Sequence, residues 1–160
     1  MICISFFGNI NLVTIDTGVA AIALEQTVDT IDINPTVASS SAILYIDGAN
    51  AIDIVGDVTT TSTSSLTIDA SGLTAQAAGT TTFDVAQVNL GASTATVSII
   101  GSDGDDNVGA SGGALNNYAT TVDAGSGADA VYTGTAADSI LGGAGNDTLS
   151  GASGNDTIKG

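Results

Sequence analysis

Aspartate recurs at every ninth residue near the end of the chain, and each aspartate is followed two residues later by a large apolar residue. The aspartates are Asp129, Asp138, Asp147 and Asp156, and the apolar residues are Val131, Ile140, Leu149 and Ile158. Small residues, many of them glycine, fill the positions before each aspartate. Two columns that stay in register over four nonapeptides predict a structural repeat that holds a carboxylate at one fixed place.

The nonapeptides follow, with substitutions, the pattern G-G-x-G-x-D-x-U-x, in which U is a large apolar residue. We expect a six-residue turn and then a three-residue strand, because glycine adopts positive φ without a Cβ clash. The turn carbonyls can then point inward beside the aspartate carboxylate. Calcium takes six to eight oxygens at about 2.3–2.6 Å, which two stacked turns can supply and one turn cannot. The spacing therefore predicts that Ca²⁺ binds between stacked turns.

Each nonapeptide should reverse the chain, so that two of them make one coil of a solenoid. Turns two repeats apart would then stack on the same edge, about 4.8 Å from one another. This places Asp129 and Asp147 on one edge, Asp138 and Asp156 on the other, and the apolar column inside. Such a thin core needs the metal for stability. The simpler alternative is that these aspartates only cap the backbone of their own turns.

A separate copy of the pattern lies upstream, at Gly101–Gly109, with Asp106 and Val108 in the two columns. We include Asp103 and Asp106 among the candidate calcium ligands, with a solvated acidic turn as the alternative. Residues 110–123 are out of phase apart from Val122, and we expect a loop or an irregular coil there.

Residues 1–100 have no fixed period, but short runs rich in Val, Ile and Thr alternate with small polar residues. Such runs are typical of β-strands. The segment Ala20–Gln26 is the one stretch that could be argued to be a helix. The predicted fold is therefore all-β. Residues 1–100 should form an irregular β-solenoid or β-sandwich, and residues 101–160 a calcium β-roll within a parallel β-solenoid.

The composition limits the possible functions. The chain has 160 residues, 17 of them acidic and one basic, with a net charge of −16. We expect no nucleic-acid partner, because phosphate neutralisation requires Lys and Arg. We expect no membrane insertion, since the longest apolar run, Val19–Leu24, is far too short. Histidine is absent, so the usual triads cannot form, and we expect no enzyme, although a glycosidase with two carboxylates remains conceivable.

Ice binding would require regular rows of hydroxyl groups on a flat face. The outward positions of the repeats are mixed instead, as when Ala144 matches Ser153 or when Ala130 matches Thr148. From the sequence we therefore expect no regular hydroxyl row.

The end of the chain resembles the RTX (repeats-in-toxin) calcium-binding β-roll family. Gly142–Ser150 matches the family pattern completely, and Gly151–Lys159 departs from it at Ala152. The resemblance implies that the sixth-position aspartates and the turn carbonyls bind Ca²⁺. The implied ligands are Asp129, Asp138, Asp147 and Asp156, with Gly125, Gly127, Gly142, Gly143, Ala144, Gly145, Gly151, Ser153 and Gly154. Ala124, Thr133 and Ala136 replace glycines of the pattern, which weakens the expectation for the first two turns.

The whole chain is also similar to bacterial S-layer and large secreted β-solenoid proteins, through Leu66–Leu73, Ser98–Asp106 and the repeats. This similarity implies an extracellular calcium-binding structural protein at the cell surface. Such a protein would assemble with itself into a surface layer, sheath or filament. The alternative is a calcium-folding RTX module of a secreted toxin, exoenzyme or adhesin, and an adhesin would bind a cell-surface glycan.

Overall fold

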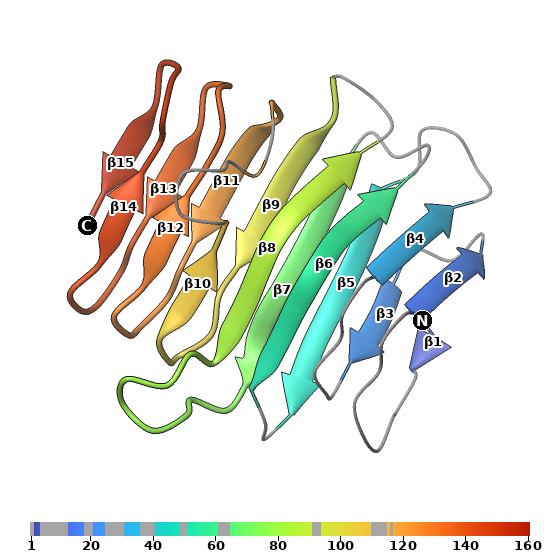
Figure 1. The fold of residues 1–160 in the computed structure, drawn as a ribbon, viewed down its shortest axis with the longest axis horizontal. Helices are drawn as coiled ribbons and strands as arrows, with labels where there is room; N and C mark the ends of the chain where they lie inside the picture. The colour runs from blue at the N-terminus through green and yellow to red at the C-terminus, as the bar shows by residue number, and fades with distance from the viewer. Residues whose placement is uncertain are drawn as a thin grey trace.

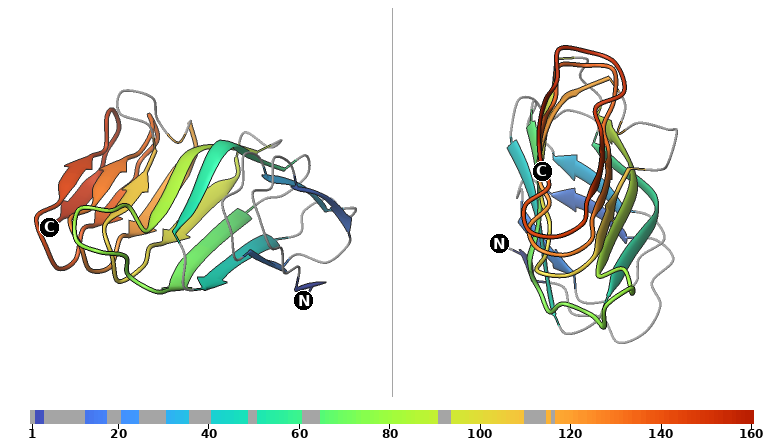
Figure 2. Two further views of the ribbon diagram at one scale, coloured as in Figure 1. Left: turned by 60° about the horizontal axis from the view of Figure 1, so that its bottom comes forward. Right: turned by 90° about the vertical axis from the view of Figure 1, so that its left-hand side faces the viewer.

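A computed structural model describes residues 2–3, 13–17, 21–24, 31–35, 41–48, 51–60, 65–90, 94–109, 115 and 117–160. Strands alternate between two facing sheets along the chain, so that two successive strands make one coil (Figures 1 and 2). Every strand pair in the described residues is parallel. The fold is therefore a parallel β-solenoid, as the sequence predicted, and the alternative of an antiparallel sandwich does not hold.

The eight-stranded sheet contains the odd-numbered strands: β1 (Ile2–Cys3), β3 (Ala21–Leu24), β5 (Ser41–Gly48), β7 (Ser65–Leu73), β9 (Thr96–Ile100), β11 (Ala119–Asp123), β13 (Ser139–Leu141) and β15 (Thr157–Lys159). The seven-stranded sheet contains the even-numbered strands: β2 (Val13–Thr17), β4 (Ile31–Pro35), β6 (Ile52–Thr60), β8 (Phe83–Leu90), β10 (Asp106–Val108), β12 (Ala130–Tyr132) and β14 (Thr148–Ser150). The strands shorten toward the C-terminus, where each strand is three residues long.

A narrow apolar core lies between the two sheets. Alternate strand residues point inward, as in β7 and β9, and the large side chains of Leu44, Phe83 and Ile99 are fully buried. In the repeats, Val131 and Ile140 continue this column and are also buried. Ile158 of β15 is 48% exposed, since no strand of the described residues lies beyond β15 in the sheet. The apolar positions of the repeats therefore form the core that their spacing predicted.

The last strands follow the nonapeptide period. β12 pairs with β14 and β13 with β15, and the residues in register are eighteen positions apart, as with Ala130 and Thr148. Upstream the coil is longer, since Asp106 lies one rung above Asp129 at a separation of 23 residues. The strand ladders also continue across residue 100, so the two predicted parts of the chain share both sheets.

Two segments that the sequence left open contain strands, and the second of them lies in an irregular coil, one of the two alternatives given for it. Within Ala20–Gln26, residues Ala21–Leu24 form the strand β3, which pairs with β1 and β5, because sheet pairing stabilises a segment too short for an isolated helix. Within 110–123, residues Ala119–Asp123 form β11, whose Val122 is buried between Ile99 and Ile140 of the neighbouring strands. Residues 110–114 and 116 of that segment lie outside the described residues. No helix in the described part of the chain is long and apolar enough to cross a membrane.

Candidate metal centre

The Gly-rich turns stack on two edges of the solenoid, two repeats apart, as the period predicted. Turn 124–129 lies against turn 142–147, and main-chain hydrogen bonds join them. The Gly127 N–H donates to the Ala144 carbonyl (2.8 Å), and the Ala144 N–H donates to the Gly125 carbonyl (3.0 Å). Turn 133–138 lies against turn 151–156 on the other edge, where the Ser153 N–H donates to the Gly134 carbonyl at 3.4 Å. The first edge is thus the more tightly connected.

The sixth-position aspartates link each rung to the one before it. Oδ1 of each carboxylate accepts a hydrogen bond from the amide at the equivalent position one rung earlier. On the first edge, the Asp106 N–H donates to Asp129 (2.9 Å) and the Asp129 N–H donates to Asp147 (3.2 Å). On the second edge, the Thr120 N–H donates to Asp138 (2.8 Å) and the Asp138 N–H donates to Asp156 (3.0 Å). One oxygen of each aspartate therefore serves the fold itself.

The second carboxylate oxygen has no such role in the two central aspartates. Oδ2 of Asp129 and Oδ2 of Asp138 are buried and have no hydrogen-bond partner. Burying an anionic oxygen without a partner is unfavourable. A buried, unpartnered carboxylate oxygen on each edge is what a bound hard cation would satisfy.

The first edge also concentrates negative charge. Burial, together with the neighbouring carboxylates of Asp106, Asp147 and Asp105, raises the pKa of Asp129 to about 7, although the hydrogen bond from the Asp106 amide acts in the opposite direction. Burial likewise raises the pKa of Asp106 to about 6, although Ser102 and Phe83 donate hydrogen bonds to it. Both shifts arise because a lone anion is unstable there. A divalent cation would remove this penalty by neutralising the column of carboxylates.

Main-chain oxygens must supply most of a metal's coordination shell. Among the described residues, no group of three or more Asp, Glu, Cys or His side chains could hold a metal ion. The turns do bring the main chains of successive rungs close together. Gly145 has a φ of 144°, and a Cβ built on it would clash with the Gly127 carbonyl oxygen of the turn above. Glycine at this position thus permits the close main-chain stacking that a carbonyl-rich calcium site needs.

The residues present on the first edge fit Ca²⁺. The carboxylates of Asp129 and Asp147 would provide charged oxygens, and the carbonyls of the turns 124–129 and 142–147 would provide neutral ones. Four of their glycines adopt positive φ, namely Gly125, Gly127, Gly143 and Gly145. The sequence placed all these residues in the site, and the solenoid brings them to one edge.

The second edge has a different turn. Ala136 replaces the fourth-position glycine, and neither Gly134 nor Ala136 adopts positive φ in turn 133–138. Thr133 takes the repeat position of Gly142, and a Cβ built on Gly142 would clash with Oδ2 of Asp147. The Thr133 side chain is buried, and its hydroxyl has no hydrogen-bond partner. Turn 133–138 is therefore less well arranged for a calcium ion than the turns of the first edge, whereas turn 151–156 keeps positive φ at Ala152 and Gly154.

The upstream copy uses its acidic side chains within the protein. The Asp106 carboxylate accepts hydrogen bonds from Ser102 N–H (2.6 Å), Ser102 Oγ (2.7 Å) and Phe83 N–H (3.1 Å). Asp103 is exposed. Calcium binding by Asp103 and Asp106 stays a prediction, and protein donors already surround the Asp106 carboxylate.

Asp105 has a structural role that the sequence did not reveal. Its carboxylate accepts hydrogen bonds from the N–H groups of Gly79 (2.7 Å) and Ala128 (2.8 Å), and these two bonds lower its pKa. It thereby connects the loop after β7 to the first calcium turn. Both partners are distant in sequence, so no local pattern could have identified this role.

Comparison with known families supports the assignment of this region. The model of the RTX calcium-binding nonapeptide repeat matches residues 123–158, in four copies. The comparison with curated proteins found no match, and neither did the comparison with solved structures. The matched residues carry the stacked turns and both aspartate columns, so residues 123–158 contain RTX nonapeptide repeats, which are calcium-binding repeats.

Proposed function

We propose that this chain is a structural, non-catalytic protein that folds with Ca²⁺ outside the cell and assembles with copies of itself into a surface layer, sheath or filament. The RTX repeats indicate a calcium-binding module of a secreted protein. The observation that best supports the calcium role is the buried, unpartnered Oδ2 of Asp129 in a column of carboxylates. Self-assembly is the further step of the proposal.

The ends of the solenoid support self-assembly. Within the described part of the chain, β15 and β14 each have a strand neighbour on one side only, and β1 and β2 stand in the same position at the opposite end. Unpaired strand edges favour the addition of another strand. Ile158 exposes 48% of its surface at the β15 end, where a further rung would cover it. A second copy that added its first rung to this end would bury the apolar side chain and continue both sheets.

The two ends are different surfaces, so the contact between copies would be head-to-tail. Such a contact forms an open filament when its rotation does not close a ring. Calcium would promote the assembly by ordering the last turns. We therefore expect polymers at millimolar Ca²⁺ and their dissociation when a chelator is added.

Electron microscopy and light scattering of the purified chain, with Ca²⁺ and with EGTA, test this proposal. The matched variants are Ile158→Asp, at the exposed end, and Tyr45→Asp, which alters the other large exposed apolar side chain of the described residues, on β5. We expect Ile158→Asp to abolish polymers while Tyr45→Asp preserves them. Monodisperse particles of the unaltered protein at every calcium concentration would contradict self-assembly.

The second candidate is a calcium-folding module of a secreted toxin, exoenzyme or adhesin, with the main activity elsewhere in a longer chain. The RTX match supports this candidate equally. It predicts calcium-induced folding without polymers, so the same microscopy distinguishes the two. Under both candidates the C-terminal coils have the same physical role, which is to become rigid where calcium is abundant.

A further inference from the structure

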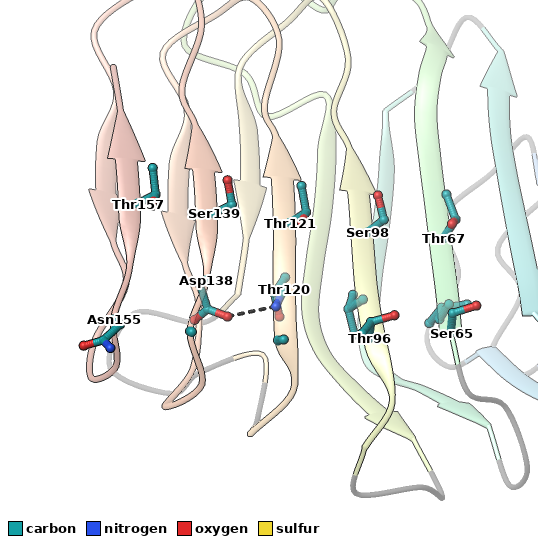
Figure 3. A pocket seen from close by; sticks show the side chains of 14 residues that line it. Ser65, Thr67, Thr96, Ser98, Thr120, Thr121, Asp138, Ser139, Asn155 and Thr157 are labelled. Atoms are coloured by element: carbon teal, nitrogen blue, oxygen red, sulfur yellow. Dashed lines mark hydrogen bonds between the residues drawn. The ribbon is translucent and has the colours of Figure 1, made fainter.

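A shallow groove of about 550 Å³ crosses the outer face of the eight-stranded sheet, over β7, β9, β11, β13 and β15 (Figure 3). The groove runs along the solenoid axis and therefore crosses the strands. Apart from Asp138, which is a candidate calcium ligand, the residues that line this surface have no role in calcium binding or in the proposed contact between the ends. The nature of its lining identifies what could bind there.

One row of hydroxyl groups follows the groove, with one side chain from each of five consecutive strands (Figure 3). Its members are Thr67, Ser98, Thr121, Ser139 and Thr157, and each is in register with the next. Consecutive hydroxyl groups are thus spaced by one rung, about 4.8 Å. The outward positions of the repeats showed no regular array in the sequence, whereas this row is continuous across the sheet. The row mixes serine with threonine and crosses coils of unequal length, so no fixed sequence period marks it.

A second line of small or polar residues lies two positions earlier in the sequence and includes Ser65, Thr96 and Asn155 (Figure 3), with Ala119 in register with Thr96. Between these lines, Asp138 contributes to the groove lining. Asp138 is 3% exposed, and its Oδ2 has no hydrogen-bond partner. This oxygen is the one that a cation on the second edge would satisfy, so the hydroxyl groups of the row, and not Asp138, are the contacts that the groove offers to a ligand.

The charge of the groove limits the classes of ligand that could bind there. Its lining contains hydroxyl groups, one amide and one carboxylate, and no basic side chain. The chain as a whole carries a net charge of −16, which repels polyanions. Serine and threonine hydroxyls both donate and accept hydrogen bonds, and this matches a neutral ligand that also carries hydroxyl groups.

The spacing between rungs further limits which kind of polymer could bind along the groove. An extended peptide along the groove would advance by about 3.3 Å per residue and present same-side groups about 6.6 Å apart, out of step with the rungs. A chain of linked sugar rings advances by nearly one rung per ring, so each ring can meet one hydroxyl of the row. We propose that this groove binds a linear, neutral polysaccharide, which lies along the solenoid axis across β7 to β15.

The binding is built from many weak contacts. The groove lining contains no aromatic side chain on which a sugar could stack, so each ring contributes little. Several rings bound at once raise the affinity by effective concentration. We therefore expect binding that rises steeply with the length of the oligosaccharide and that a disaccharide hardly shows.

The test uses the full chain in Ca²⁺ with the neutral β-linked hexasaccharides of glucose, mannose and N-acetylglucosamine. Polygalacturonate serves as the anionic comparison. Calorimetry gives the affinity, and NMR chemical shifts locate the contact. We expect at least one neutral hexasaccharide to bind, its disaccharide to bind far more weakly, and polygalacturonate not to bind. No binding of any of the three hexasaccharides, or equal binding of polygalacturonate, overturns the proposal.

Three variants test whether the hydroxyl row binds the oligosaccharide. Thr121→Val with Ser139→Ala removes two hydroxyl groups at nearly constant volume and should weaken binding about twentyfold, or about fivefold per hydroxyl. Thr121→Ser keeps the hydroxyl and should bind as the unaltered chain does. Thr148→Val changes an exposed threonine of β14, on the opposite sheet, and should have no effect. Circular dichroism checks the fold of each variant. If the double variant and Thr148→Val bind alike, the row is not the site.

Discussion

The amide of Asp129 donates a hydrogen bond to Oδ1 of Asp147, at 3.2 Å and across eighteen residues of sequence. This bond joins two rungs on the calcium edge and turns the Asp147 carboxylate toward the rung above. A Cβ added to Gly142 would meet the other oxygen of Asp147, Oδ2. A single aspartate thus has two separable roles, a hydrogen bond that sets the stacking and a charge available to a metal.

Replacing Asp147 with asparagine separates these two roles. The asparagine side chain would keep an oxygen that can accept the Asp129 N–H, but it would lose the negative charge. Without calcium we expect a higher melting temperature, because the repulsion between this carboxylate and Asp129 is removed. With calcium we expect affinity to fall roughly tenfold or more, since the charge of the ligands sets the affinity of calcium sites.

Thermal melts and calcium titrations of Asp147→Asn measure both effects. Asp123→Asn is the matched control, because it removes an exposed carboxylate from β11, outside the repeat turns. The control should leave calcium affinity nearly unchanged. Unaltered calcium affinity in Asp147→Asn would show that Asp147 is not a ligand.

Gly145 should tolerate no side chain. Its φ of 144° disfavours any other residue, and a Cβ would clash with the Gly127 carbonyl of the stacked turn. We expect Gly145→Ala to lower the free energy of unfolding by more than about 2 kcal/mol, because strain and clash add together. Calcium affinity should fall as well, since the two turns are pushed apart.

Gly79 provides the control for this effect. Its φ is also positive, at 82°, but a Cβ there would meet no atom within 4 Å. Gly79→Ala should therefore cost only the backbone strain, about 1 kcal/mol, with no change in calcium affinity. Equal destabilisation by the two alanines, measured by denaturant unfolding, would mean that the close stacking at Gly145 is unimportant.

The stability of the calcium-free protein should decrease as pH rises toward neutrality. The folded-state pKa of Asp129 is about 7 and that of Asp106 about 6, against an ordinary value of 3.8. Between the ordinary and the raised values the folded state binds more protons than the unfolded state, so deprotonation destabilises the fold. We expect a higher melting temperature in EGTA at about pH 5 than at about pH 8.

Calcium should reverse this trend, because it binds the deprotonated carboxylates and releases their protons. Affinity should thus fall as pH decreases below about 7. Asp129→Asn should flatten the pH dependence in EGTA, whereas the exposed control Asp123→Asn should preserve it. Calcium-free stability that instead rises between about pH 5 and pH 8 would contradict the burial of these groups in the folded state.

The second edge should gain calcium affinity when its turn is given the glycines of the family pattern. Thr133→Gly removes a buried hydroxyl with no partner, and Ala136→Gly allows positive φ at the fourth position. We expect the double variant to bind one more Ca²⁺, or the same number more tightly. Ala137→Gly, at an exposed position of the same turn, controls for the added flexibility of glycine. An unchanged calorimetric stoichiometry and affinity would mean that the two edges are already equivalent.

The repeats could be predicted from sequence because the period alone fixes them. Every ninth residue must return to one of two edges, so the spacing alone assigns Asp129 and Asp147 to the same side. The inward column of Val131 and Ile140 followed from the same spacing. Apolar and β-branched runs also identified the upstream strands, such as Thr96–Ile100 and Phe83–Val85, which lie in β9 and β8.

The remaining features depend on contacts that no local pattern encodes. The coil between Asp106 and Asp129 is five residues longer than the regular coil of eighteen, and the additional residues lie between β10 and β11, because β11 pairs with β13 at the regular separation. Ala21–Leu24 is a strand because β1 and β5 pair with it. The hydroxyl row joins Ser98 to Thr121 across the same long coil, so it became visible only once the strands were in register.

The central claim is that Ca²⁺ lies between stacked turns of this solenoid. The most direct test is an anomalous difference map from crystals grown in about 10 mM Ca²⁺, well above the roughly 10⁻⁴–10⁻³ M dissociation constants of extracellular calcium modules. We predict a strong peak between turns 124–129 and 142–147, within bonding distance of a carboxylate oxygen of Asp129 or Asp147. A map from such crystals with both edges free of anomalous density would contradict the account.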